Sequence, residues 1–127
     1  MTLHVTALYG AFHALFNVAL AANVSRLRGK TNVFLGTGSS DELLTAARRH
    51  GNHAEYIALA LVLLAVCELN GASVTVLHAL GGALTVGRLA HAAGIGDKPE
   101  PTRAVGALLT WVAIAGAGIY GAVLALR

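Results

Sequence analysis

The chain has 127 residues, which suits a single domain, and 56% of them are hydrophobic while only 12% are charged. A soluble domain carries about 25% charged residues, so this composition excludes an ordinary water-soluble fold and predicts one membrane-embedded domain, residues 1–127. The formal net charge of +3 is modest, and the basic residues cluster beside apolar segments, which argues against nucleic acid as a partner.

Four apolar segments predict four membrane-crossing helices. A helix needs about 20 residues to cross the hydrocarbon layer, so four spans use most of the chain. Strands would require a closed barrel, and the sequence has no alternating pattern for one. We therefore expect an all-α integral membrane protein, a four-helix up-down bundle with helices over about 3–25, 41–69, 74–94 and 102–126.

The first helix raises the question of a cleaved leader. Residues 19–21, Ala-Leu-Ala, resemble a signal-peptidase site at the end of an apolar stretch. However, no Lys or Arg precedes this stretch, whereas Arg26, Arg28 and Lys30 follow it. This charge order is typical of a retained span, so we interpret the segment as the first helix of the bundle.

Basic residues predict how the bundle is oriented. In an up-down bundle, nearly all of them fall at one end: Arg26, Arg28, Lys30, Arg48, Arg49, Arg88, Lys98 and Arg103. Membrane proteins carry an excess of Lys and Arg on the cytoplasmic side. We therefore expect that end to face the cytoplasm and both termini to lie outside.

The second helix brings polar residues to membrane depth. Its apolar run, residues 56–69, is too short to span alone, so the helix must extend back through a polar block. Arg48, Asn52 and Glu55 are spaced i, i+4, i+7 and share one helix face. Each is costly in hydrocarbon unless it faces a cavity or a partner. Two readings stay open: a ligand site, or a self-satisfied network that ties helices together.

The third and fourth helices add more polar groups at the same end. Arg88 and His91 are i, i+3 neighbours, and Arg103 opens the next helix. Arg88 alone is compatible with snorkelling to the interface, and Arg103 with a plain topology anchor. Together with Arg26 and Arg48 they give a cationic excess at one level of the bundle. This favours an anionic ligand, because the arginine fork binds carboxylates in a bidentate manner.

The histidines and the cysteine do not predict a metal site. Cys67 is the single cysteine, so it has no partner for a disulfide or a metal pair. His13 and Asn17 share a face of the first helix, where an interhelical hydrogen bond is the simpler role. His50 and His53 point in different directions and form no His-x-x-x-His pair.

Four blocks of this sequence resemble the MAPEG family, the membrane-associated proteins in eicosanoid and glutathione metabolism, which include microsomal glutathione transferases and prostaglandin E synthase. The blocks are residues 26–28, Arg-Leu-Arg; residues 48–57, with His-Gly-Asn-x-Ala-Glu-Tyr; residues 86–91, Val-Gly-Arg-Leu-Ala-His; and Arg103. The bacterial branch is the nearest match. One departure is that residues 92–95 lack the aromatic that family members often carry after this histidine.

The resemblance implies a homotrimer in a bacterial inner membrane, with glutathione as co-substrate bound between subunits near the cytoplasmic side. By position, the glutathione-contacting or pocket-forming residues are Arg26, Arg48, Asn52, Glu55, Arg88, His91 and Arg103. Arg103 matches the thiolate-activating arginine of the family. Such an arginine acts by lowering the pKa of the nearby thiol from about 8.5. The implied activity is a glutathione-dependent transferase or peroxidase acting on lipophilic electrophiles or lipid hydroperoxides, small molecules that arrive through the membrane lipids.

Two other functions remain as alternatives. The same fold includes a member that presents lipid without chemistry of its own, and the missing aromatic favours such a non-catalytic lipid- or partner-binding role. A four-span drug or cation transporter is disfavoured, because the first helix has no carboxylate to couple to protons.

Overall fold

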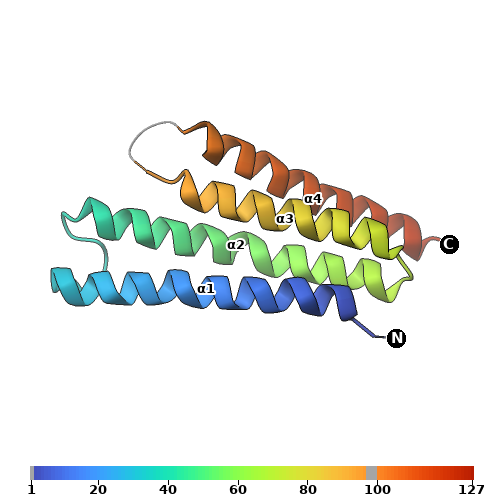
Figure 1. The fold of residues 1–127 in the computed structure, drawn as a ribbon, viewed down its shortest axis with the longest axis horizontal. Coiled ribbons are helices and arrows are strands. Elements are labelled where there is room, and N and C mark those ends of the chain that lie inside the picture. Colours follow the sequence, from blue (N-terminus) through green and yellow to red (C-terminus); the bar gives the residue numbers. More distant parts are fainter. Residues whose placement is uncertain (1, 97–99) are drawn as a thin grey trace.

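The computed structural model describes residues 2–96 and 100–127, and within them the protein is built from four helices and no strands (Figure 1). Figure 1 shows both termini at the same end, as an up-down order requires. The expected all-α four-helix architecture is confirmed. The helices are α1 (His4–Thr31), α2 (Asp41–Leu69), α3 (Val74–Ala93) and α4 (Pro101–Ala125).

Local signals set the helix ends. Ser40 and Ser73 precede α2 and α3, and their hydroxyls accept hydrogen bonds from the Leu43 N–H (3.2 Å) and the Val76 N–H (3.3 Å). The prediction that the first helix ends near residue 25 is wrong, because α1 continues to Thr31. Its last turns are too polar for a membrane span but still form helix.

Three helices, α1, α2 and α4, are long and apolar enough to cross a membrane, counted over the part of the chain that the structure describes. The fourth, α3, contains His78, Arg88 and His91, which lower its hydropathy. It nevertheless joins the end of α2 to the start of α4 at the opposite end of the bundle. Its 20 residues span about 30 Å, the thickness of the hydrocarbon layer.

Glycines bring α3 and α4 into close contact. A Cβ added to Gly106 would lie 2.7 Å from the Gly87 carbonyl oxygen and would also collide with the His91 backbone, so only glycine fits here. Small residues permit this kind of close helix approach in membranes. The contact fixes the part of α3 that carries Arg88 and His91 beside the first turns of α4.

The α1–α2 hairpin extends past α3 and α4 at the end away from the termini (Figure 1). It has its own small apolar core of Leu27, Leu43 and Ala46. Arg28 holds the loop between α1 and α2 in place, because its guanidinium donates to the carbonyl of Gly36 at 2.9 Å. Figure 1 also shows α1 and α4 at opposite edges of the molecule, with α2 and α3 between them.

Candidate anion-binding cavity between α2, α3 and α4

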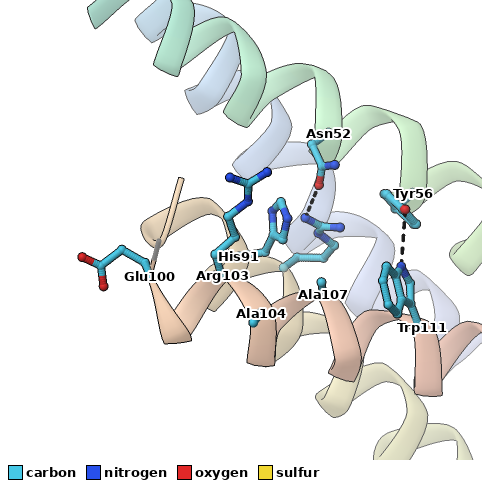
Figure 2. A pocket seen from close by; sticks show the side chains of 9 residues that line it. Asn52, Tyr56, His91, Glu100, Arg103, Ala104, Ala107 and Trp111 are labelled. Atoms are coloured by element: carbon cyan, nitrogen blue, oxygen red, sulfur yellow. Dashed lines mark hydrogen bonds between the residues drawn. The ribbon is translucent and has the colours of Figure 1, made fainter. Parts of the chain in front are cut away.

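A cavity of about 460 Å³ opens between α2, α3 and α4 (Figure 2). Its polar side consists of Asn52, Arg88, His91 and Arg103. Its other side is formed mainly by apolar and aromatic groups, namely Tyr56, Ala104, Ala107 and Trp111. Figure 2 shows Glu100, which also borders the cavity, pointing away from the other side chains. The hollow thus has one cationic and one apolar side.

Arg88 is the central charge of the polar side. Only 2% of this residue is exposed, and its guanidinium donates to the Asn52 side-chain oxygen at 2.6 Å. Its Cζ lies 5.3 Å from the centroid of the Tyr56 ring, a cation–π arrangement. Among the described residues no carboxylate pairs with Arg88. A buried charge without a counter-ion is unfavourable, so this guanidinium is suited to an anion that enters the cavity.

A second, smaller cavity of about 160 Å³ adjoins the first on the side of the α1–α2 hairpin. Asn52, His91 and Arg103 line both cavities, and Arg48 lines the smaller one. Beside it, Arg49 donates to the carbonyl of the lining residue Ile95 at 2.8 Å, which holds the segment after α3 against α2. The two cavities therefore form neighbouring parts of one cation-rich hollow.

The apolar side carries two aromatic residues that contact each other. The Trp111 indole N–H donates to the Tyr56 hydroxyl at 3.3 Å, and the dashed line in Figure 2 marks this bond between α4 and α2. Trp111 is 55% exposed on the outside of the bundle. Small side chains at Ala104 and Ala107 leave room between this pair and the arginines. A lipophilic molecule in the bilayer can therefore reach this side of the cavity.

The structure brings most of the predicted site residues together, but not all of them. Asn52, Arg88, His91 and Arg103 share the larger cavity, and Arg48 joins them in the smaller one.

Arg26 and Glu55 line neither cavity. Arg26 is exposed on α1 and bonds its own helix through Asn23 at 3.0 Å. Glu55 is exposed on α2. The expectation that all seven residues converge is therefore not met within one chain. Arg26 is excluded because α1 lies on the far side of the bundle from α4 (Figure 1), and Glu55 because it lies on an exposed face of α2.

Two lining residues were not assigned a role from the sequence. Tyr56 follows Asn52 by four residues, so the helical repeat places it on the same side of α2. Trp111 lies eight residues after Arg103, with Ala107 halfway between them on the same face of α4. This helical spacing could have identified Tyr56 and Trp111 as lining residues, but only once α2 and α4 are known to face each other.

Comparison with known proteins assigns the chain to a family. The family model described as "MAPEG family" matches residues 6–123, which is nearly the whole chain. The chain belongs to the MAPEG family. Among its relatives, Inner membrane protein YecN of Escherichia coli K12 is 39% identical over 110 residues, covering 87% of this chain and 84% of the relative. The protein of the same name from Escherichia coli O6:H1 matches to the same extent. No solved structure matches the chain.

MAPEG membership confirms the resemblance seen in the four sequence blocks and supports a membrane location. The E. coli relative is named as an inner membrane protein, and the three apolar helices of this chain agree with that environment. The relative's name specifies no reaction, so the chemistry of the cavity must be argued from its residues.

Proposed function

We propose that this MAPEG protein is a glutathione-dependent transferase or peroxidase that acts on lipophilic electrophiles or lipid hydroperoxides. The observation that carries the proposal is the buried Arg88 guanidinium, which has no carboxylate partner among the described residues and borders an open cavity. Glutathione has two carboxylates and one ammonium, so its net charge is negative. It therefore matches a hollow that Arg48, Arg88 and Arg103 make cationic.

The arginines support both binding and chemistry in this proposal. Arg48 and Arg88 hold the glutathione carboxylates, because guanidinium groups bind carboxylates through paired hydrogen bonds. Arg103 lies beside the sulfur and stabilises the thiolate, which lowers the pKa of the thiol and raises the nucleophilic fraction at neutral pH. The thiolate then attacks the electrophilic atom of the second substrate, and the displaced electron pair departs with the leaving group.

The apolar side of the cavity supports a lipophilic second substrate. Tyr56 and Trp111 form an aromatic wall that is partly open to the outside of the bundle. An apolar substrate gains free energy when it moves along such surfaces without entering water. Thiolate and electrophile would then meet between the arginines and this wall.

Exposed charges support an assembly of several copies. Glu55 lies about 21 Å along α2 from Leu69, which is well within a hydrocarbon layer of about 30 Å. A carboxylate exposed to lipid at this depth is unfavourable, so another protein surface must shield it from the lipid. We propose that neighbouring subunits of a homotrimer provide it, with Arg26 and Glu55 completing the site across the interface. In this arrangement the cavity faces the cytoplasm and both termini lie outside.

Calorimetric titration of the purified protein with glutathione tests the proposal. Saturable binding is expected for wild type, and Arg88→Met and Arg103→Ala should weaken it about tenfold or more, since a hydrogen bond to a charged group contributes about 1.5–3 kcal/mol. Arg127→Met is the matched control, because it removes an arginine at the far end of the bundle and should leave affinity unchanged. Wild type that binds no glutathione in several detergents would reject the proposal.

A non-catalytic lipid- or partner-binding role is the second candidate. The large apolar side of the cavity favours it, as does the segment 92–95, which contains no aromatic residue. Turnover separates the two functions. Glutathione conjugation of an aryl halide, or reduction of a lipid hydroperoxide, supports the enzyme. Co-purified lipid in the cavity with no thiol-dependent turnover supports the binding role.

A further inference from the structure

A second polar cluster lies between α1, α2 and α3, and of its members only Arg88 also lines a cavity. Its centre is a pair of buried histidines, His13 on α1 with 1% exposed and His53 on α2 with 0% exposed. Their ring centroids are 5.4 Å apart, and the Phe16 ring packs edge-on against His53 at 4.9 Å. Neither the cation-rich hollow nor its aromatic wall includes these residues.

Hydrogen-bonding groups of this cluster lack protein partners. In the part of the chain that the structure describes, the buried side-chain atoms without a partner include His13 Nδ1, Asn17 Oδ1, His53 Nδ1, His53 Nε2 and Arg88 Nε. Asn17 lies one helical turn after His13. Arg88 follows Thr85 by three residues on α3, and the Thr85 hydroxyl lies 3.3 Å from the His13 ring. Arg88 also bonds Asn52, the residue before His53. Buried polar groups are nearly always hydrogen-bonded, so these atoms need a partner that the surrounding side chains do not provide.

The hydrogen-bond direction at His13 can be assigned. The Thr85 hydroxyl donates to the Gly81 carbonyl at 2.8 Å, so it has no hydrogen left for the His13 Nε2 that lies 3.3 Å away. It must instead accept from Nε2–H. In the neutral ring this leaves the His13 Nδ1 as an acceptor that points to no protein donor.

The partner must be small and uncharged. A second copy of the chain cannot reach residues that are 0–1% exposed inside one bundle, and the hydrocarbon tails of lipids offer no hydrogen bonds. A metal cation is disfavoured by the nearby Arg88 charge. Water meets the requirements, because buried waters make two to four hydrogen bonds and act both as donors and as acceptors.

We propose that His13, Asn17 and His53 form a buried water site that accepts from the Arg88 Nε–H and so holds the guanidinium toward the cavity. Asn52 fixes one side of the guanidinium from α2. The water site fixes its other side from α1 and α2. His13 and His53 are positioning residues for Arg88 and have no contact with the ligand. Only the effect on glutathione affinity, described below, rests on the proposed function.

Nuclear magnetic resonance of ¹⁵N-labelled protein in nanodiscs tests the site. The Arg88 Nε–H signal is identified by its loss in Arg88→Lys. Wild type should show magnetisation transfer from water to this group and to both imidazoles. His53→Phe should abolish the transfer at Arg88 and speed the exchange of its Nε–H about tenfold, whereas His53→Gln, which keeps a hydrogen-bonding side chain, should restore both. His4→Phe, at an exposed histidine far from the cluster, should change neither.

Two results would overturn the inference: no water transfer at Arg88 in wild type, or an Arg88 signal that is the same in wild type, His13→Phe and His53→Phe. If His53→Phe does not fold, His13→Phe tests the same site from α1. In a glutathione titration, His53→Phe should lower affinity about tenfold and His53→Gln should recover it. A wild type that binds no glutathione would reject the proposed function, while the resonance measurements still decide the water site.

Discussion

At the scale of single residues, the fluorescence of Trp111 can report the binding of a ligand in the cavity. It is the single tryptophan of the chain, and it lies on the cavity wall with its indole bonded to Tyr56. A ligand that enters the cavity changes the polarity around the indole. We expect glutathione, or an apolar substrate analogue, to shift the tryptophan emission in a saturable way.

A fluorescence titration checks this expectation. Trp111→Phe should abolish the signal, while calorimetry on the same variant should still detect glutathione binding with an affinity within about threefold of wild type, because the lost bond lies on the apolar side. An emission spectrum that stays constant while calorimetry shows binding would place the ligand elsewhere.

Arg88 should matter for ligand binding but not for the stability of the fold. A buried charge without a counter-ion contributes little to stability, and replacing buried ionic groups by apolar residues of similar volume is often neutral or stabilising by about 1–4 kcal/mol. Asn52, which would lose its partner, borders the cavity and can bind solvent instead. We therefore expect Arg88→Met to melt at the same temperature as wild type or higher, even though it binds glutathione weakly. Circular dichroism during heating measures this, and a fall of many degrees would assign Arg88 a structural role.

At the scale of helices, α2 caps the start of α1. Glu68, near the end of α2, accepts hydrogen bonds from the backbone N–H groups of Val5 (2.9 Å) and Thr6 (2.7 Å). Leu3, the residue before α1, provides no side-chain cap. A carboxylate at a helix N-terminus satisfies free N–H groups and interacts favourably with the helix dipole.

Substitution of Glu68 should loosen the first turn of α1. We expect Glu68→Ala to lower the free energy of unfolding by about 0.5–2 kcal/mol, the usual cost of losing a helix cap. Hydrogen exchange at Val5 and Thr6 should become faster, while the middle of α1 remains protected. Glu42→Ala is the control, because its carboxylate makes only an exposed pair with Lys30. Equal exchange in the two variants would contradict the capping role.

The contact between α3 and α4 makes a second prediction about helices. Gly106→Ala places a methyl group against the backbone of Gly87 and His91. Either α3 and α4 move apart, or the methyl group stays in unfavourably close contact with that backbone. We expect a loss of about 1–3 kcal/mol and weaker glutathione binding, because Arg88 and His91 move away from Arg103. Gly118→Ala on the same helix meets no atom within 4 Å and should be neutral or slightly stabilising. Chemical denaturation of both variants distinguishes close packing from helix propensity.

The sequence predicted where the helices lie along the chain better than it predicted which helices pack against each other. Apolar segments located the four helices, because hydropathy is a local signal, and the structure then showed the caps Ser40 and Ser73. The end of α1 was misplaced, since charge clusters mark the membrane boundary rather than the end of a helix. The predicted site residues on α2, α3 and α4 were brought together as expected, except for Glu55. Arg26 was not, because periodicity shows which residues share a face but not which helices are adjacent.

At the scale of the whole molecule, the four helices have unequal lengths, and this determines where the hollow opens. The α1 and α2 helices have 28 and 29 residues, whereas α3 has 20, so the hairpin projects about 12 Å beyond α3. The smaller cavity lies at this step, where Arg48 on the projecting part of α2 faces Arg103 at the start of α4. In the proposed function, a polar ligand enters from the water side, while an apolar one reaches Trp111 from the bilayer.

The proposed homotrimer predicts that defective subunits complement each other. If the complete site combines Arg26 of one subunit with Arg88 of its neighbour, then Arg26→Ala and Arg88→Met chains should each bind glutathione poorly. In mixed trimers made by co-expression, about a quarter of the interfaces combine an intact Arg26 with an intact Arg88. Calorimetry should detect that fraction of sites at wild-type affinity, and native mass spectrometry should give the mass of three chains. The double variant on one chain has no intact interface and should recover nothing. Arg26→Ala chains that bind glutathione as tightly as wild type would mean that the site lies within a single chain, where Arg26 is too far away to contribute.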